Sequence, residues 1–250
     1  MISKINAFKH LLTTYMAALP KVVEGMFNIF NPVATQRFVH NILGADDLQK
    51  NCPRLGTASI LEILKSSSFE DIEIMGKYYD GRTGGTHNML EDAILAFVCK
   101  TTKPKLIFEF GTFIGQTTRI FALNTPPNTK IVTLDLADIQ TQHVIGKSIL
   151  GTPEQNKVLM ISGNSTSYDF SQWHGKCDLV WVDACHDYDY VVSDTKNAFK
   201  LVRPGGCIMW HDYRHTAWWS GVTRHLRELK PSYPNLIHIR GTTIAILQNF

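Results

Sequence analysis

The fold of this chain is decided by one segment, Leu106-Ile107-Phe108-Glu109-Phe110-Gly111-Thr112-Phe113-Ile114-Gly115-Gln116-Thr117-Thr118. Its first five residues are a short apolar run before a glycine, which is typical of a buried strand. Residues 116–123 then have the spacing of a helix. The two glycines would let the backbone approach a ligand closely, and the helix would present free N–H groups to an anion. A tight strand-to-helix turn without a ligand is the alternative interpretation.

The chain after residue 88 repeats this alternation of apolar strands and helices. We expect strands at 106–110, 131–135, 157–161, 178–183, 207–210, 236–240 and 242–247, and helices at 89–98, 116–123, 139–149, 190–202 and 220–229. Continuously apolar strands that alternate with helices indicate a parallel sheet covered on both faces. The prediction is an α/β protein with a doubly wound, mostly parallel, Rossmann-like seven-stranded sheet. Ligands of such sheets bind at the carboxyl ends of the strands.

The first 87 residues have a different pattern, which indicates a mostly helical N-terminal region that serves as a cap or in oligomerisation. We expect helices at 3–19, 33–43 and 57–65 there, and residues 88–250 form the ligand-binding domain. Apolar residues recur at helical spacing in the first helix, which favours an amphipathic helix over a signal peptide. Because such a helix must bury its apolar face, we expect a homodimer.

Composition excludes several classes of protein. With 44% hydrophobic residues in 250, the chain is globular and not disordered. Its net charge of +3 comes from scattered basic residues, so we expect no nucleic-acid partner. No apolar stretch approaches the ~20 residues of a membrane span. The five cysteines are odd in number and lack a CxxC pair, so reduced thiols and a cytoplasmic location are expected.

Asp135 gives the first indication of the ligand. It ends the second strand of the domain, 24 residues after Gly111. An acidic residue at about this distance accepts hydrogen bonds from the hydroxyls of a ribose. A nicotinamide site would favour a glycine where Phe113 stands. The pattern therefore indicates a cofactor that contains a nucleoside.

At this point the sequence resembles the class I S-adenosylmethionine-dependent methyltransferases. Their first motif is an acidic residue, a spacer and a glycine-rich turn, as in Glu109 to Gly115. The turn Arg203-Pro204-Gly205-Gly206 and the closing strand pair around Gly241 are further features of that family. The resemblance covers roughly residues 84–250. It implies S-adenosylmethionine as cofactor, bound by Glu109, Gly111, Thr112, Gly115, Thr117, Asp135, Asn164, Ser165 and Asp183.

A narrower resemblance concerns the ends of the next two strands. The segments Asp183-Ala184-Cys185-His186 and Trp210-His211-Asp212-Tyr213 are similar to those of catechol-type and macrolide-sugar O-methyltransferases and cephalosporin-hydroxylase-like proteins. The resemblance implies that Asp183 and Asp212 bind a divalent metal, Mg²⁺ or Mn²⁺, and that Asp183 and His186 are catalytic, with His186 the general base.

This chain departs from that group in two places. Ala184 stands where glycine is common, and His211 and Tyr213 flank the second acid where a carboxylate or amide is usual. His211 is a candidate third ligand and would suit a softer metal than Mg²⁺. The third ligand therefore stays open, as does catalysis by His186 without a metal.

The expected function is O-methylation of a hydroxyl on a small molecule or sugar. A bound metal would lower the pKa of that hydroxyl, and a neutral imidazole removes the proton near pH 7. Three alternatives remain: a nicotinamide-dependent oxidoreductase, a non-catalytic binding module with the same fold, and a metal-dependent hydroxylase or hydrolase. Trp218 and Trp219 either pack in the core or wall the acceptor pocket. Residues 84–88 either reach the site or act as a linker.

Overall fold

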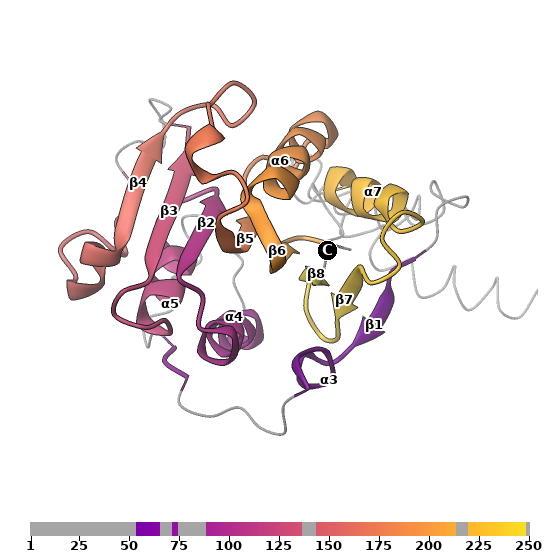
Figure 1. Ribbon diagram of the computed structural model, residues 1–250, viewed down its shortest axis with the longest axis horizontal. Helices are drawn as coiled ribbons and strands as arrows, with labels where there is room; N and C mark the ends of the chain where they lie inside the picture. Colours follow the sequence, from indigo (N-terminus) through magenta and orange to yellow (C-terminus); the bar gives the residue numbers. More distant parts are fainter. Residues whose placement is uncertain (1–53, 66–71, 75–88, 137–143, 214–219, 249–250) are drawn as a thin grey trace, which may run out of the picture.

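A computed structural model describes residues 54–65, 72–74, 89–136, 144–213 and 220–248 of the chain (Figure 1). Several predictions lie outside these residues: the helices at 3–19 and 33–43, the role of residues 84–88, the first part of the helix at 139–149, and Trp218-Trp219. The division of the chain at residue 87 and the homodimer stay predictions. In the part of the chain that is described, no helix is both long and apolar enough to cross a membrane.

Strands and helices alternate along the described chain. The strands are β1 (Gly56–Ala58), β2 (Leu106–Phe110), β3 (Lys130–Asp135), β4 (Val158–Ser162), β5 (Cys177–Val182), β6 (Val202–Trp210), β7 (Ile237–Ile239) and β8 (Ala245–Gln248). The helices are α3 (Ile60–Leu64), α4 (Met89–Thr102), α5 (Gln116–Leu123), α6 (Tyr188–Leu201) and α7 (Ser220–Leu229), with short 3₁₀ turns η2 (Pro153–Lys157) and η3 (Ser171–Trp173).

The strands form one sheet in the order β1-β7-β8-β6-β5-β2-β3-β4. Neighbouring strands are parallel except for β8, which is antiparallel to β6 and to β7. From β2 the chain runs outward to β3 and β4, and then returns to build β5 and β6 on the other side. The doubly wound, mostly parallel sheet is thus confirmed. Its strand order reverses between β2 and β5, where such sheets bind ligands.

The sheet has eight strands in the described residues, where we expected seven. The additional strand is β1, which pairs in parallel with β7 and occupies part of the helix predicted at 57–65. That helix begins only after Ser59, whose side chain accepts from the Glu62 N–H while the Glu62 carboxylate accepts from the Ser59 N–H. A three-residue strand has too little periodicity to be recognised in sequence, because its partner strand decides it.

The helix predicted at 139–149 is wrong over residues 144–149, which form a series of turns. Two of these residues donate backbone hydrogen bonds to the turn after β2 instead: Gly146 N–H to the Phe113 carbonyl at 2.7 Å, and Ser148 N–H to the Ile114 carbonyl at 2.7 Å. Gly146 also has a φ of +69°, which an α-helix does not contain. This segment therefore supports the glycine turn from outside.

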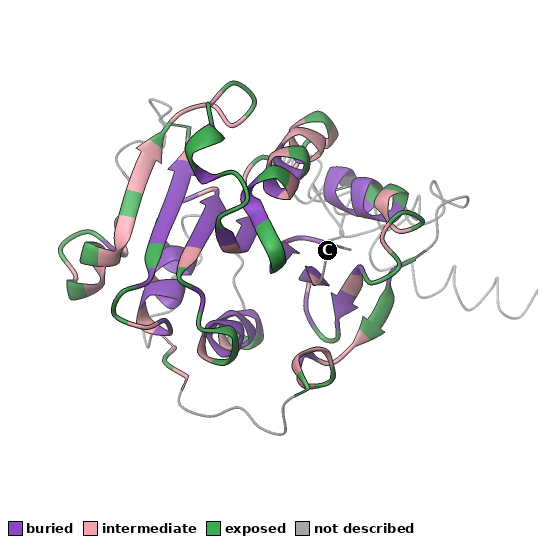
Figure 2. Cartoon of the chain, in the orientation of Figure 1, coloured by how far each residue is buried: buried purple, intermediate pink, exposed green. Residues whose placement is uncertain are grey.

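Both faces of the sheet are covered, and the central strands are buried (Figure 2). Phe108 and Phe110 point to the face covered by α6 and α7, where they contact Phe170. Ile107 points to the opposite face and packs in one cluster with residues of α4 and α5. The side chains of Ile107, Phe108 and Phe110 are fully buried. The packing holds β2 and its neighbours rigidly, so the residues that follow these strands have defined positions.

Candidate active site

The ends of four parallel strands lie level with one another. The residues in register are Leu134 of β3, Phe110 of β2, Val182 of β5 and Trp210 of β6. The residues that follow them are Asp135, Gly111, Asp183 and His211. The sheet thus brings four of the predicted site residues to one edge.

Gly111 connects the glycine turn to the acid after β5. Its φ is +92°, and a Cβ on it would lie 2.1 Å from the Asp183 carbonyl oxygen. The Asp183 N–H in turn donates to the Phe110 carbonyl at 3.0 Å. Only glycine permits this approach, since any side chain would displace the backbone of Asp183. The glycine of the motif is therefore required by the neighbouring strand end as well as by a ligand.

Gly115 begins α5 with a φ of +78°, and no side chain caps the helix there. Its own N–H donates to the Thr112 carbonyl at 2.7 Å, which closes the turn. A Cβ at Gly115 would lie 3.1 Å from the Gly146 Cα, so the two glycines pack backbone against backbone. The first N–H groups of α5 thus receive no capping side chain at this edge of the sheet.

Asp135 is half-buried and belongs to the same turn. Its Oδ2 accepts a hydrogen bond of 2.5 Å from the Phe113 N–H, and Phe113 has a left-handed φ of +43°. Burial raises the pKa of Asp135 more than its backbone hydrogen bonds lower it. The side chain is held at the tip of β3, where the ribose interaction was predicted.

Glu109 lies inside the sheet, with no exposed surface. The Thr118 hydroxyl donates to its Oε2 at 2.5 Å, whereas Oε1 is buried without a hydrogen bond from the described residues. Burial raises the pKa of Glu109 to about 8, against the effect of the Thr118 hydrogen bond. The predicted cofactor residues Thr112 and Thr117 are buried as well, and Thr112 shares a hydrogen bond of 2.6 Å with Thr133. These buried side chains pack beneath the glycine turn after β2.

Asn164 and Ser165 follow β4, which is the outermost strand on this side. The Asn164 Oδ1 accepts from the Thr166 N–H at 2.9 Å and from the Thr166 hydroxyl at 2.8 Å. The Ser165 carbonyl accepts from the Asn197 side chain at 3.2 Å. The loop after β4 is thereby fixed, and the two residues lie at the same edge of the sheet as Asp135.

The acids after β5 and β6 form one cluster with two histidines. His186 Nε2 is 2.8 Å from Asp212 Oδ2 and 3.7 Å from Asp183 Oδ1. His211 Nδ1 is 3.3 Å from each of the same two oxygens. The His186 side chain is 28% exposed and that of His211 only 6%, so the pair of carboxylates has one accessible and one buried imidazole.

Glu91 is the site residue that sequence reasoning missed. It lies in the first turn of α4, is 1% exposed, and its Oε2 is 3.2 Å from His211 Nε2. Its Oε1 accepts from the N–H of Thr243 at 2.6 Å and from its hydroxyl at 2.8 Å. The available signal was an acid pair, Glu91-Asp92, at the start of an apolar helix. Nothing in the sequence shows that it meets His211, 120 residues away.

The opposite charges in the cluster shift one another's pKa values toward the charged forms. Burial by itself would lower the pKa of His211, but Asp183, Asp212 and Glu91 raise it well above its ordinary value. The pKa of His186 is likewise raised by Asp183 and Asp212 despite burial. Burial opposes a low pKa for Asp212, yet its hydrogen bonds with the two histidines lower it. The Asp212 carboxylate is therefore ionised at neutral pH.

The cluster has the composition of a metal site. Within the described ranges, Asp183, His186 and Asp212 each offer a ligand atom, and these atoms lie within 4.8 Å of one another. Carboxylate oxygens with an imidazole nitrogen suit divalent ions such as Mn²⁺ and Zn²⁺. His211, the predicted third ligand, faces the same two carboxylates from the buried side.

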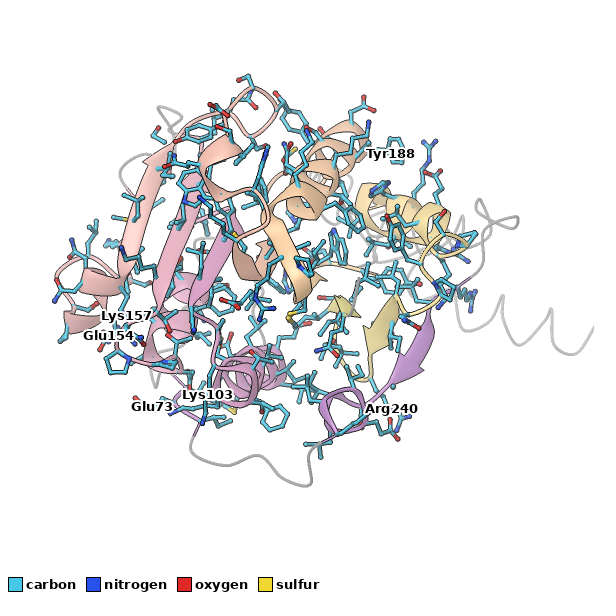
Figure 3. All side chains as sticks on the ribbon, in the orientation of Figure 1. Glu73, Lys103, Glu154, Lys157, Tyr188 and Arg240 are labelled. Atoms are coloured by element: carbon cyan, nitrogen blue, oxygen red, sulfur yellow. The ribbon has the colours of Figure 1, made fainter. Side chains whose placement is uncertain are left out.

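The start of α7 packs against the loop that carries His186. A Cβ on Gly221 would lie 2.3 Å from the His186 carbonyl oxygen and 2.6 Å from the Tyr188 nitrogen. Tyr188, between α6 and α7 in Figure 3, donates from its hydroxyl to Glu228 at 2.5 Å and lies under the Arg224 guanidinium. The loop of His186 is thus held between two helices.

Comparison with known proteins agrees with this geometry. Residues 108–213 match the sequence family described as a methyltransferase domain. A curated relative, caffeoyl-CoA O-methyltransferase from Stellaria longipes, is 30% identical over 134 residues, which is 52% of this chain and 53% of the relative. The match therefore spans about half the length of that relative. All the site residues after the strand ends, from Gly111 to Asp212, lie within the matched family range.

Solved structures share the fold. A Klebsiella pneumoniae protein provisionally described as an O-methyltransferase has a TM-score of 0.55 at 19% identity, over 67% of this chain and 83% of that one. The O-methyltransferase TomG from Streptomyces achromogenes, solved with S-adenosylmethionine, has a TM-score of 0.51 at 17% identity, over 66% and 82% of the two chains. The expected fold is thereby confirmed, and the match of residues 108–213 to a methyltransferase domain agrees with the resemblance.

Proposed function

We propose that this chain, whose residues 108–213 match a methyltransferase domain, is a class I S-adenosylmethionine-dependent methyltransferase that methylates a hydroxyl group of a small molecule or sugar. One observation carries the proposal. The glycine turn and the carboxylate–histidine cluster are in direct backbone contact, because Gly111 packs against the Asp183 carbonyl. A cofactor at the turn and an acceptor at the cluster would therefore be neighbours.

The proposed cofactor site consists of the turn and the strand ends beside it. Asp135 accepts hydrogen bonds from the ribose hydroxyls, and the uncapped start of α5 faces the charged amino-acid end. Asn164 and Ser165 border the adenine, and the backbone of Asp183 closes the other side. The turn formed by Gly111 and Gly115 is supported from below by three buried residues, Glu109, Thr112 and Thr117.

The proposed catalytic residues are His186 and Asp183. His186 Nε2 lies 2.8 Å from Asp212 Oδ2, and the neutral imidazole accepts the proton of the acceptor hydroxyl. The acceptor oxygen then forms a bond to the methyl carbon, and the carbon–sulfur bond breaks with its electrons left on sulfur. Asp183 and Asp212 hold the imidazole and stabilise the imidazolium that results.

Asp183, Asp212 and His211 are the proposed ligands of a divalent metal. Such an ion, when bound, supplies Lewis-acid chemistry that lowers the pKa of a hydroxyl group. The two carboxylates provide the charge that the ion requires, and His211 faces them from the buried side. The name of the curated relative, a caffeoyl-CoA O-methyltransferase, supports a hydroxyl acceptor without identifying it.

Calorimetric titration of the EDTA-treated protein with S-adenosylmethionine, and separately with NADH, tests the proposal. We expect S-adenosylmethionine to bind and Asp135→Ala to abolish binding. An acceptor screen with and without Mg²⁺ or Mn²⁺ then follows. Absence of S-adenosylmethionine binding, with or without metal, would refute the proposal, and NADH binding would favour an oxidoreductase instead.

A further inference from the structure

The buried side of the carboxylate–histidine cluster contains a chain of contacts that extends beyond the proposed metal ligands. It runs from Thr243 through Glu91 to His211, and from His211 to Asp183 and Asp212. The inference drawn from it rests on the proposed metal site and concerns which ion that site prefers.

Glu91 is held in one orientation. Both donors of Thr243, the N–H and the hydroxyl, bind its Oε1, so Oε2 is left to face His211 Nε2 at 3.2 Å. The carboxylate is 1% exposed and has no solvent to compete for this contact. Histidines that bind metals commonly donate their other ring N–H to a carboxylate, which orients the ring and makes it a better ligand. Glu91 and His211 have this arrangement.

The other ring nitrogen then points at the two acids. His211 Nδ1 is 3.3 Å from Asp183 Oδ1 and 3.3 Å from Asp212 Oδ2. Around an ion with bonds of about 2.1 Å, adjacent ligands at right angles are about 3 Å apart. Both distances from Nδ1 therefore match the distance between adjacent ligands of a single ion. His186 contacts the same oxygens from the accessible side, where a base is needed.

We propose that Glu91 is a positioning residue: it fixes His211 as a nitrogen ligand beside Asp183 and Asp212, so that the site prefers a first-row transition ion such as Mn²⁺ over Mg²⁺. The physical reason is that Mg²⁺ strongly favours oxygen ligands, whereas imidazole binds the transition ions well.

The test uses the full chain, stripped with EDTA and without added S-adenosylmethionine. Titration calorimetry measures the Kd for Mn²⁺ and for Mg²⁺, and pulsed electron paramagnetic resonance of the Mn²⁺-loaded protein detects coupling to ¹⁴N. We expect Mn²⁺ to bind at least about 10-fold more tightly than Mg²⁺. We also expect a ¹⁴N signal that survives His186→Gln and disappears in His211→Gln.

Glu91→Gln tests the positioning role, and Asp92→Asn is its matched control. Asp92 is the next residue of α4 and equally buried, but its Oδ2 contacts Gln116, outside the cluster. We expect Glu91→Gln to weaken Mn²⁺ binding about 10- to 100-fold, and Asp92→Asn to leave it unchanged. Circular dichroism and the affinity for S-adenosylmethionine report whether each variant is folded.

Several results would overturn the inference. These are absence of Mn²⁺ binding, no ¹⁴N coupling in the wild type, a signal lost in His186→Gln but kept in His211→Gln, or an unchanged Mn²⁺ Kd in folded Glu91→Gln. If Glu91→Gln does not fold, the ¹⁴N coupling in the wild type and in the two histidine variants still decides whether His211 is a ligand. The titration with S-adenosylmethionine is independent of the metal, so failure of the proposed function would be distinguished from failure of this inference.

Discussion

Glu109 makes the stability of this protein depend on pH in a way that one isosteric substitution should remove. Its carboxyl is fully buried in β2, and burial raises its pKa to about 8 from an ordinary value of 4.5. Between these two values the folded state keeps a proton that the unfolded state has released. The free energy of unfolding contributed by Glu109 therefore falls as pH rises through this range.

The magnitude follows from the size of the shift. Each pH unit between 4.5 and about 8 costs roughly 1.4 kcal/mol, which adds up to on the order of 5 kcal/mol at most. Glu109→Gln removes this loss, because the amide has the shape of the neutral acid and never ionises. Its oxygen still accepts from the Thr118 hydroxyl, which donates to Oε2 in the wild type.

Urea unfolding followed by tryptophan fluorescence at pH 5, 6, 7 and 8 measures the effect. We expect the two proteins to be similar at pH 5 and the Gln variant to become progressively more stable than the wild type toward pH 8. A stability difference between Glu109→Gln and wild type that does not change with pH would refute the reasoning.

Three further predictions concern binding, catalysis and packing. Asp135→Asn should weaken S-adenosylmethionine binding about 10- to 100-fold in calorimetry, because hydrogen bonds to a charged group contribute about 1.5–3 kcal/mol; an unchanged Kd would exclude the ribose role. Gly221→Ala should lower kcat with little change in S-adenosylmethionine affinity, since a Cβ would lie 2.3 Å from the His186 carbonyl oxygen; equal turnover would show that the loop tolerates the shift. Phe108→Ala should cost about 3–5 kcal/mol in urea unfolding, because its ring is fully buried; a loss below 1 kcal/mol would mean that the core closes around the gap.

Much of the fold was predictable because its signals are local. Buried parallel strands are continuously apolar, and glycines mark the turns that follow them, so β2 to β8 could be located within a few residues. The register of these strands then placed Asp135, Asp183 and His211 at one edge. Local signals were misleading where distant contacts decide the backbone. Gly56–Ala58 is a strand only through β7, and residues 144–149 form turns because they bind the turn after β2.

In the candidate site, too, some features follow from the local sequence and others depend on distant contacts. The sequence by itself determined that four residues lie close together, because each stands within four residues of the end of one of two neighbouring parallel strands. These residues are Asp183, His186, His211 and Asp212. Only the tertiary structure decided which histidine is buried behind the carboxylates and that Glu91 holds it. That contact joins a helix and a strand end 120 residues apart. Hydrophobic periodicity tells which face of a helix is buried, but the partner of a buried acid depends on how the whole core packs.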